Sequence, residues 1–135
     1  MYLDVSKRVP EEACGLLFGK GDQIEEIFSV TNILHSPNRY RMDPQEQYHL
    51  MKNMEDQGWD LLAIYHSHPQ GPPYPSPTDV AEAYYPNAVY LIWGLDHKGK
   101  WECKGYLIQR GLMNFNIIEV PIEVNMNWEQ ELDNE

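Results

Sequence analysis

The chain has few cysteines, few basic side chains and no long apolar run, and each shortage excludes a class of protein. Its two cysteines among 135 residues are too few for a disulfide framework. We interpret Cys14 and Cys103 as reduced thiols of a cytoplasmic protein. Apolar runs such as Leu61 to Tyr65 are far too short to span a bilayer. The N-terminus shows no basic segment followed by an apolar core, so we expect no signal peptide.

Basic side chains are also scarce beside acidic ones. The chain has 10 lysines and arginines against 21 aspartates and glutamates, and its formal net charge is -11. A nucleic-acid-binding surface needs clustered cations, so this balance argues against nucleic acid and against anionic membranes as partners. A basic partner is allowed by the charge, although acidity often reflects solubility alone. We expect residues 129–135, which are mostly acidic, to form a solvated, frayed tail.

The length and the 42% hydrophobic content are those of one globular domain, which we expect to span residues 1–128. Apolar runs bounded by glycine, proline or polar turns predict strands at residues 14–19, 23–31, 59–65, 88–93, 101–109 and 115–124. A helical stub before Pro10 and helices at 43–57 and 76–85 are predicted between them. This alternation predicts a mixed α/β sheet with helices packed on it.

Residues 43–57 carry the signals of a helix that packs on the sheet. Asp43 is a suitable N-cap, Pro44 fits the first helical position, and Glu46 completes a capping box. Apolar residues at helical spacing then predict a buried stripe, which we assign to Tyr48, Met51 and Met54. A methionine stripe of this kind is typical of core packing.

The stretch from Tyr65 to Asp79 concentrates side chains that bind metals. It contains two of the 5 histidines, His66 and His68, at the end of a predicted strand. Side chains at i and i+2 of a strand point to the same face, so the two imidazoles are expected to lie together. Asp79, at the head of the next helix, adds an oxygen ligand. Two histidines and one carboxylate are a three-ligand set of a catalytic zinc centre, with the fourth position left to water.

Hydrolysis at such a centre needs two further groups. Zinc lowers the pKa of its bound water to about 7, and a general base outside the ligand set must move the proton. Glu12, just before the predicted strand 14–19, is the candidate base, provided that this strand lies beside strand 59–65. Ser76 is the candidate for stabilising the oxyanion.

Each of these residues also has a plain structural interpretation. A His-x-His pair often occurs by chance. Ser76-Pro-Thr-Asp79 is a complete capping box, which explains both residues without a metal. Glu12 is equally consistent with a surface acid, and Cys14 is more typical of a small core residue than of a nucleophile. The remaining histidines are assigned no role at a site: His35, His49 and His97.

The order and spacing of these residues resemble a known family. Glu12-x-Cys-Gly-Leu-Leu is followed by His66-Ser-His68-Pro, six further residues and Ser76-x-x-Asp79. This pattern is similar to the motif of the JAMM (MPN-plus, Mov34/PAD-type) zinc metalloproteases. The likeness extends over about residues 10–122, and it resembles the small prokaryotic members also at Asn32, Pro37 and Asp43. The His-Glu-x-x-His motif of other zinc proteases is absent.

The resemblance implies a cytidine-deaminase-like fold, with a mixed sheet flanked by helices in a single domain. It implies one Zn²⁺ per chain held by His66, His68 and Asp79, with Glu12 as general acid/base and Ser76 at the oxyanion. Family members cut amide or isopeptide bonds after the C-terminal glycine of ubiquitin-like proteins. Small bacterial members process sulfur-carrier proteins, so the expected partner is a ubiquitin-like or sulfur-carrier protein that ends in Gly-Gly.

The sequence departs from the family pattern at its N-terminus, where the usual helix is a stub and the first strand is missing. This leaves the packing behind Glu12 open, and a partner chain, such as the second subunit of a homodimer, could cover it. The proline-rich loop 70–75 either grips an extended substrate tail or only places Ser76. Two rival hypotheses remain. One is a non-catalytic MPN-type binding scaffold, and the other is a structural zinc closed by a fourth ligand such as Cys14 or His35.

Overall fold

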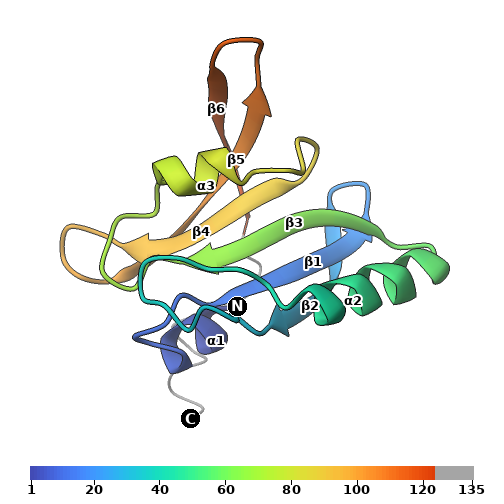
Figure 1. The fold of residues 1–135 in the computed structure, drawn as a ribbon, viewed down its shortest axis with the longest axis horizontal. Helices are drawn as coiled ribbons and strands as arrows, with labels where there is room; N and C mark the ends of the chain where they lie inside the picture. The colour runs from blue at the N-terminus through green and yellow to red at the C-terminus, as the bar shows by residue number, and fades with distance from the viewer. Residues whose placement is uncertain (124–135) are drawn as a thin grey trace.

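The computed structural model describes residues 1–123, which form a mixed α/β domain (Figure 1). Within these residues, six strands make one sheet in the order β2-β1-β3-β4-β5-β6. The strands β3 and β4 run parallel, and every other neighbouring pair is antiparallel. In chain order the elements are α1 (Tyr2–Lys7), β1 (Cys14–Lys20), β2 (Gln23–Val30), α2 (Pro44–Asp56), β3 (Asp60–Ser67), α3 (Pro77–Ala81), β4 (Val89–Leu95), β5 (Trp101–Arg110) and β6 (Phe115–Val120). The predicted fold class is confirmed.

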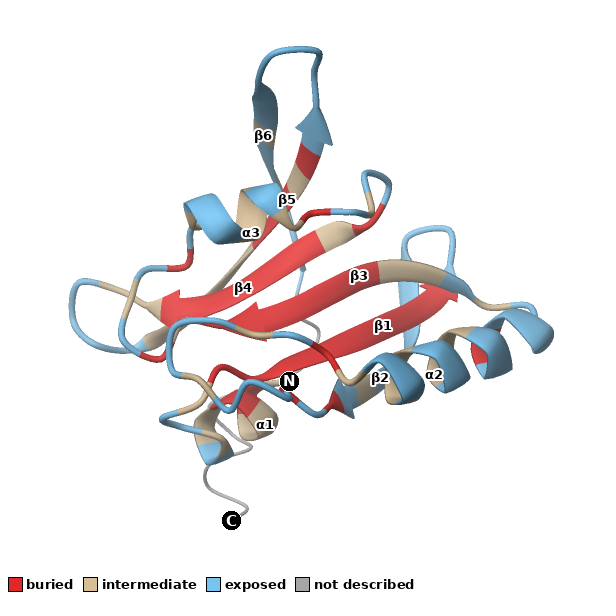
Figure 2. Cartoon of the chain, viewed as in Figure 1, coloured by how far each residue is buried: buried red, intermediate tan, exposed pale blue. Residues whose placement is uncertain are grey.

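The sheet separates two apolar layers, and its central strands are buried on both faces (Figure 2). Because side chains alternate along a strand, Ile64 and Ile92 face the layer under α2 and α3. Their neighbours Tyr65 and Trp93 face the layer under α1, where the Tyr2 ring lies 6.0 Å from the Trp93 ring. Burial on both faces explains why these strands are continuous apolar runs in the sequence.

The short N-terminal helix α1 covers one face of the sheet, so the chain itself supplies this cover. Tyr2 and Val5 of α1 are buried, and the Arg8 guanidinium donates to the carbonyl at the end of β2 at 2.9 Å. The Tyr65 hydroxyl of β3 donates to the Asp4 carboxylate at 2.6 Å. These contacts cover the sheet behind Glu12 without a second chain. This packing therefore gives no reason to require a dimer. The homodimer stays a prediction.

One residue of the predicted buried stripe of α2 is wrong. Asp43 caps this helix as expected and accepts from the backbone N–H of Gln45 and Glu46. The side chains packed on the sheet are Leu50, Met51 and Met54. Tyr48 is instead 61% exposed, because it lies two residues before Leu50 and two residues are about 200° of helix rotation.

The predicted end of the third helix is also wrong. The helix α3 ends at Ala81 instead of Tyr85, since residues after Glu82 turn back toward β4 and Tyr85 donates its backbone N–H to the Tyr90 hydroxyl at 3.1 Å. The last strand ends at Val120 instead of residue 124. The predicted domain end at residue 128 and the acidic tail 129–135 lie outside the described residues and stay predictions. No helix within residues 1–123 is long and apolar enough to cross a membrane.

Candidate metal centre

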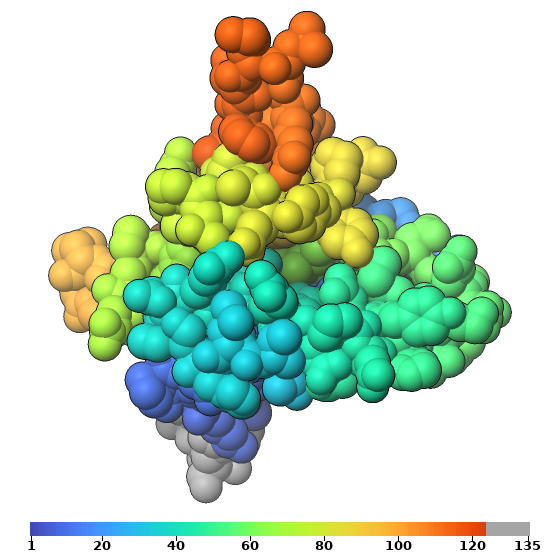
Figure 3. Space-filling view, viewed as in Figure 1, coloured from blue at the N-terminus to red at the C-terminus, as the bar shows by residue number. Residues whose placement is uncertain are grey.

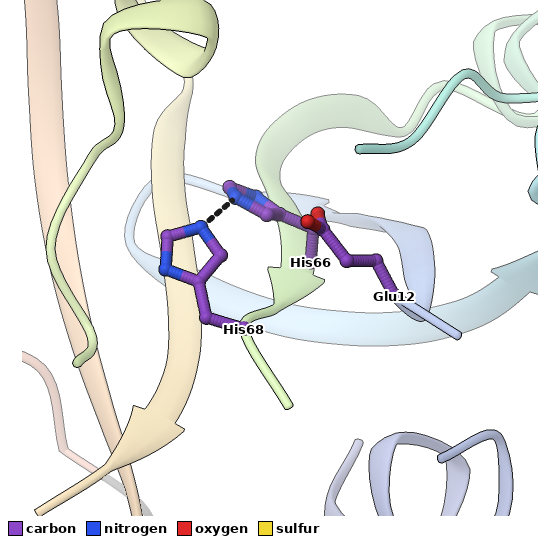
Figure 4. A group of neighbouring side chains, drawn as sticks. All are labelled: Glu12, His66 and His68. Atoms are coloured by element: carbon purple, nitrogen blue, oxygen red, sulfur yellow. Dashed lines mark hydrogen bonds between the residues drawn. The ribbon is translucent and has the colours of Figure 1, made fainter. Parts of the chain in front are cut away.

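The pairing of the central strands brings the predicted site residues together. β1 lies antiparallel to β3, with Cys14 opposite His66, so the condition set for Glu12 is met. Glu12 precedes β1 by two residues and therefore reaches past the end of β3 beside His66. His68 follows β3 directly, and Asp79 lies in the first turn of α3. Figure 4 shows the side chain of Glu12, from the segment before β1, converging with those of His66 and His68, from the end of β3.

Three ligand-type atoms form a nearly equilateral triangle. The Nε2 atoms of His66 and His68 are 3.1 Å apart. The same Asp79 oxygen, Oδ2, lies 3.1 Å from His66 Nε2 and 3.0 Å from His68 Nε2. Nitrogen and oxygen ligands about 2.0–2.1 Å from a tetrahedral zinc lie roughly 3.3 Å apart, so the triangle is close to the size that such an ion requires.

The hydrogen bond of the His68 ring leaves its Nε2 free to bind a cation between the two histidines and Asp79. Its Nδ1 lies 2.9 Å from the Pro72 carbonyl oxygen, which can only accept, so Nδ1 carries the proton. The Nε2 of the neutral ring then presents its lone pair to the Asp79 carboxylate. Two acceptors at this distance repel each other unless a proton or a metal ion lies between them. The donor set therefore fits a zinc ion.

The charges of these groups respond to one another. Burial would raise the pKa of Asp79, but the hydrogen bond and charge of His66, with hydrogen bonds from His68 and the Ser76 backbone, hold it well below its usual range. Burial would lower the pKa of His68, but in the absence of a metal ion a second proton on Nε2 lets the ring donate to Asp79 as well as to the Pro72 carbonyl, and these bonds outweigh burial and raise it. The site therefore keeps Asp79 ionised and able to bind a cation.

Glu12 is a buried acid that points at this centre. It is only 3% exposed, and its Oε1 has no hydrogen-bond partner among the described residues. Burial raises the pKa of Glu12 to about 7, against a smaller lowering by His68. One oxygen of Glu12 and one ring nitrogen of each histidine all lie within 4.8 Å of one another. A carboxyl with these properties can exchange a proton near neutral pH.

The chain's family follows from comparison with known proteins. A model of the prokaryotic homologues of the JAB domain matches residues 1–104. The chain belongs to this prokaryotic JAB family. The match spans all four residues that converge at the centre and confirms the JAMM resemblance of the sequence.

Curated relatives of this JAB chain carry the names of peptidases. The CysO-cysteine peptidase of Mycobacterium tuberculosis is 37% identical over 117 residues, which are 85% of this chain and 77% of that protein. The probable TtuB-protein conjugate cleaving protease of Thermus thermophilus is 40% identical over 67% of this chain and 60% of its own. The desampylase of Haloferax volcanii is 38% identical over 64% of this chain and 65% of its own.

Solved structures share the fold of this JAB chain. The solution structure of a protein from Desulfitobacterium hafniense superposes with a TM-score of 0.72 at 33% identity. It covers 93% of this chain and 88% of that one. A Salinibacter ruber protein gives a TM-score of 0.56 at 28% identity, over 82% of this chain and 77% of the other.

Ser76 takes part in a complete capping box at the start of α3. Its Oγ accepts from the Asp79 backbone N–H at 3.1 Å, and Asp79 Oδ2 accepts from the Ser76 backbone N–H at 2.9 Å. The capping interpretation of the sequence is thus realised in the structure. It does not compete with the metal interpretation, because the capping oxygen of Asp79 is the one that faces both histidines.

The suggested fourth ligands are engaged away from the centre. Cys14 Sγ lies 3.4 Å from the Val30 carbonyl, and burial raises the pKa of this thiol to about 12. His35 is exposed and pairs with Glu11 at 2.8 Å. Neither residue completes a structural zinc site in the described chain.

Three supporting residues were missed as parts of the site from the sequence. The Tyr40 ring stacks on the His66 ring at 4.6 Å between centroids. Ser67 accepts the Ala13 backbone N–H at 2.8 Å and so ties the segment of Glu12 to β3. The Asn32 side chain, noticed only as a family likeness, donates to the Glu12 carbonyl at 3.1 Å. Only the place of Ser67 between the two histidines was a signal available in the sequence.

A hollow of about 250 Å³ lies between the segment that leads into α2 and the segment after α3. Tyr40 forms one wall, Ile64 and Tyr90 line it from the sheet, and Glu82 and Tyr84 come from the segment after α3. Figure 3 shows this furrow between the cyan segment that leads into α2 and the yellow segment after α3. Tyr40 therefore contacts both this hollow and the His66 ring, on which it stacks.

Proposed function

We propose that this chain is a zinc-dependent peptidase or isopeptidase. Its substrate in this proposal is a ubiquitin-like or sulfur-carrier protein, cleaved at the amide bond after its C-terminal glycine. The observation that carries the proposal is the triangle of His66 Nε2, His68 Nε2 and Asp79 Oδ2 beside the buried carboxyl of Glu12, whose Oε1 has no hydrogen-bond partner among the described residues. The names of relatives from three organisms, which include conjugate-cleaving protease and desampylase, support the substrate class.

In this proposal His66, His68 and Asp79 hold the zinc. When bound, zinc supplies a water of lowered pKa and a positive charge beside the scissile carbonyl. The capping box supports the ligand role of Asp79, because the hydrogen bond from the Ser76 backbone fixes the orientation of its carboxylate. The Pro72 carbonyl does the same for the His68 ring.

Glu12 takes the proton from the attacking water and passes it to the leaving amine. Its burial and its lack of another partner support this role, because nothing else in the described chain competes for Oε1. The Ser76 hydroxyl donates to the carbonyl oxygen as negative charge develops there. It can do so while capping α3, because its oxygen only accepts in the capping box and its own hydrogen stays available.

Metal content tests the proposal first. We would purify the wild type without chelator or added metal and measure zinc by elemental analysis beside Asp79→Ala, with Asp56→Ala on the exposed end of α2 as control. We expect about one zinc per chain in the wild type and the control, and loss of zinc in Asp79→Ala. A folded wild type that stays free of zinc even after zinc is offered would overturn the zinc-dependent function.

Cleavage tests it second. A ubiquitin-like carrier ending in Gly-Gly and joined through an amide to cysteine, or through an isopeptide bond to lysine, is incubated with the zinc-loaded enzyme. Mass spectrometry should detect the free carrier and the released amine. Tight binding of such carriers without any cleavage would refute the peptidase and leave the non-catalytic scaffold.

A further inference from the structure

We propose that Tyr106 and Gly94 are positioning residues of the metal centre. They hold the segment Gly71–Pro73 on the sheet, and that segment fixes the ring of His68 through the Pro72 carbonyl. The inference rests on the proposed function, in which His68 is a zinc ligand. It also gives residues 71–73 of the proline-rich loop a task that neither earlier interpretation, gripping substrate or only placing Ser76, includes.

The loop is built around the Pro72 carbonyl. This oxygen accepts from His68 Nδ1 at 2.9 Å and from the Tyr74 backbone N–H at 2.8 Å. The His68 backbone is itself tied to the sheet, since its N–H donates to the Trp93 carbonyl at 2.6 Å. Backbone hydrogen bonds therefore fix both partners of this contact, the His68 residue and the Pro72 carbonyl.

The sheet supports the segment at three successive residues. The Leu95 backbone N–H donates to the Gly71 carbonyl at 2.8 Å. The Tyr106 hydroxyl of β5 donates to the Pro73 carbonyl at 2.5 Å, and Tyr106 is only 2% exposed. Between these contacts the segment lies directly on Gly94 of β4, because a Cβ at Gly94 would come within 2.4 Å of Pro73 N and 2.5 Å of the Pro72 carbonyl carbon.

This arrangement transmits the rigidity of the sheet to a ligand. Pro72 and Pro73 have fixed φ angles and no N–H, so the segment between the anchors has few ways to turn its carbonyls. A carbonyl that cannot turn keeps the proton on His68 Nδ1 and the Nε2 lone pair on the metal. Tyr106 touches neither metal nor substrate and acts only through this segment.

The test compares Tyr106→Phe with Tyr74→Phe in the full chain. The Tyr74 side chain is exposed, its ring lies 5.6 Å from that of Tyr106, and its hydroxyl makes no hydrogen bond among the described residues. The two variants thus remove the same atom from neighbouring rings. Zinc alone is the probe, and its affinity is measured by competition with a chromophoric chelator. We expect binding about tenfold weaker in Tyr106→Phe and unchanged in Tyr74→Phe.

A second readout separates positioning from general loss of stability. In ¹⁵N-labelled, zinc-loaded wild type, the His68 Nδ1–H should exchange slowly with water and resonate as a hydrogen-bonded proton. In Tyr106→Phe this proton should exchange faster, while the far-ultraviolet circular dichroism stays that of the wild type. Gly94→Ala should weaken zinc binding at least as much, since its methyl group displaces the segment.

The outcomes separate this inference from the proposed function. A wild type that binds zinc, with a Tyr106→Phe variant of equal affinity and equal Nδ1–H exchange, would overturn the positioning role and leave the zinc site standing. The positioning role is equally overturned if Tyr74→Phe weakens zinc binding as much as Tyr106→Phe does. A wild type that binds no zinc overturns both proposals together.

Discussion

Replacing Glu12 by glutamine should change how the stability of the zinc-free protein depends on pH. Glu12 is 3% exposed, and its pKa rises from 4.5 to about 7 on folding. The folded protein therefore binds a proton that the unfolded chain releases, so wild-type stability falls as pH rises through this window. Glutamine at this position removes the fall in unfolding free energy with rising pH, because its side chain has no charge to bury.

The magnitude follows from the pKa difference. A change from 4.5 to about 7 corresponds to roughly 3 kcal/mol, and we expect about 2 kcal/mol because the neighbouring His68 side chain is 13% exposed and solvent screens part of the effect. Relative to the wild type, Glu12→Gln should thus gain about 2 kcal/mol of unfolding free energy between about pH 4.5 and about pH 7.5.

Urea unfolding in the presence of a chelator measures this difference. Zinc must be absent, since a metal bound only by the folded state would add its own stabilisation. Glu55→Gln, on the exposed face of α2, controls for the loss of one negative charge. A stability difference between wild type and Glu12→Gln that stays constant over this pH range would refute the burial argument. A difference that shifts in favour of the wild type as pH rises would contradict its sign.

Three further predictions concern the site and the core. Glu12→Gln should keep zinc and lose cleavage by 100-fold or more, and near-normal turnover would remove Glu12 from its role. Ser76→Ala should cost about 0.5–2 kcal/mol of unfolding free energy through the lost cap and lower kcat by about 100-fold, whereas loss of stability alone would limit Ser76 to capping. Met54→Ala should destabilise the fold by about 2–5 kcal/mol and Tyr48→Ala by less than about 0.5 kcal/mol in thermal or urea unfolding, and equal effects would contradict the orientation of α2.

The sequence allowed most elements to be predicted from local signals, and the order and spacing of a family motif indicated the residues that converge at the candidate centre. The cap at Asp43 and the apolar run before His66 each follow from neighbouring residues alone. Met51 and Met54 were assigned correctly to the buried stripe of α2, but Tyr48 was assigned to it wrongly, because periodicity alone does not say which of two overlapping faces meets the sheet. Stacking of Tyr40 on His66 joins residues far apart in the chain, and no local pattern encodes it.

The supports of the metal centre were missed for the same reason. Tyr106 and Gly94 read as ordinary strand residues, since their importance comes from a loop that folds back onto them. The same segment meets both residues because β4, which carries Gly94, pairs with β5, which carries Tyr106, and the sequence indicates these only as two strands near each other in the chain.

The parallel pairing of β3 with β4 has a consequence for how the activity can be lost. Parallel neighbours need a crossover, and here the crossover from β3 to β4 carries His68 and Asp79 directly after His66. The proposed metal ligands thus come from one short stretch of chain, whereas Glu12 reaches them only when β1 has docked beside β3. A change confined to the Glu12 side chain would remove the proposed proton transfer and leave the three proposed ligands in place, so metal content and turnover can fail independently in this fold.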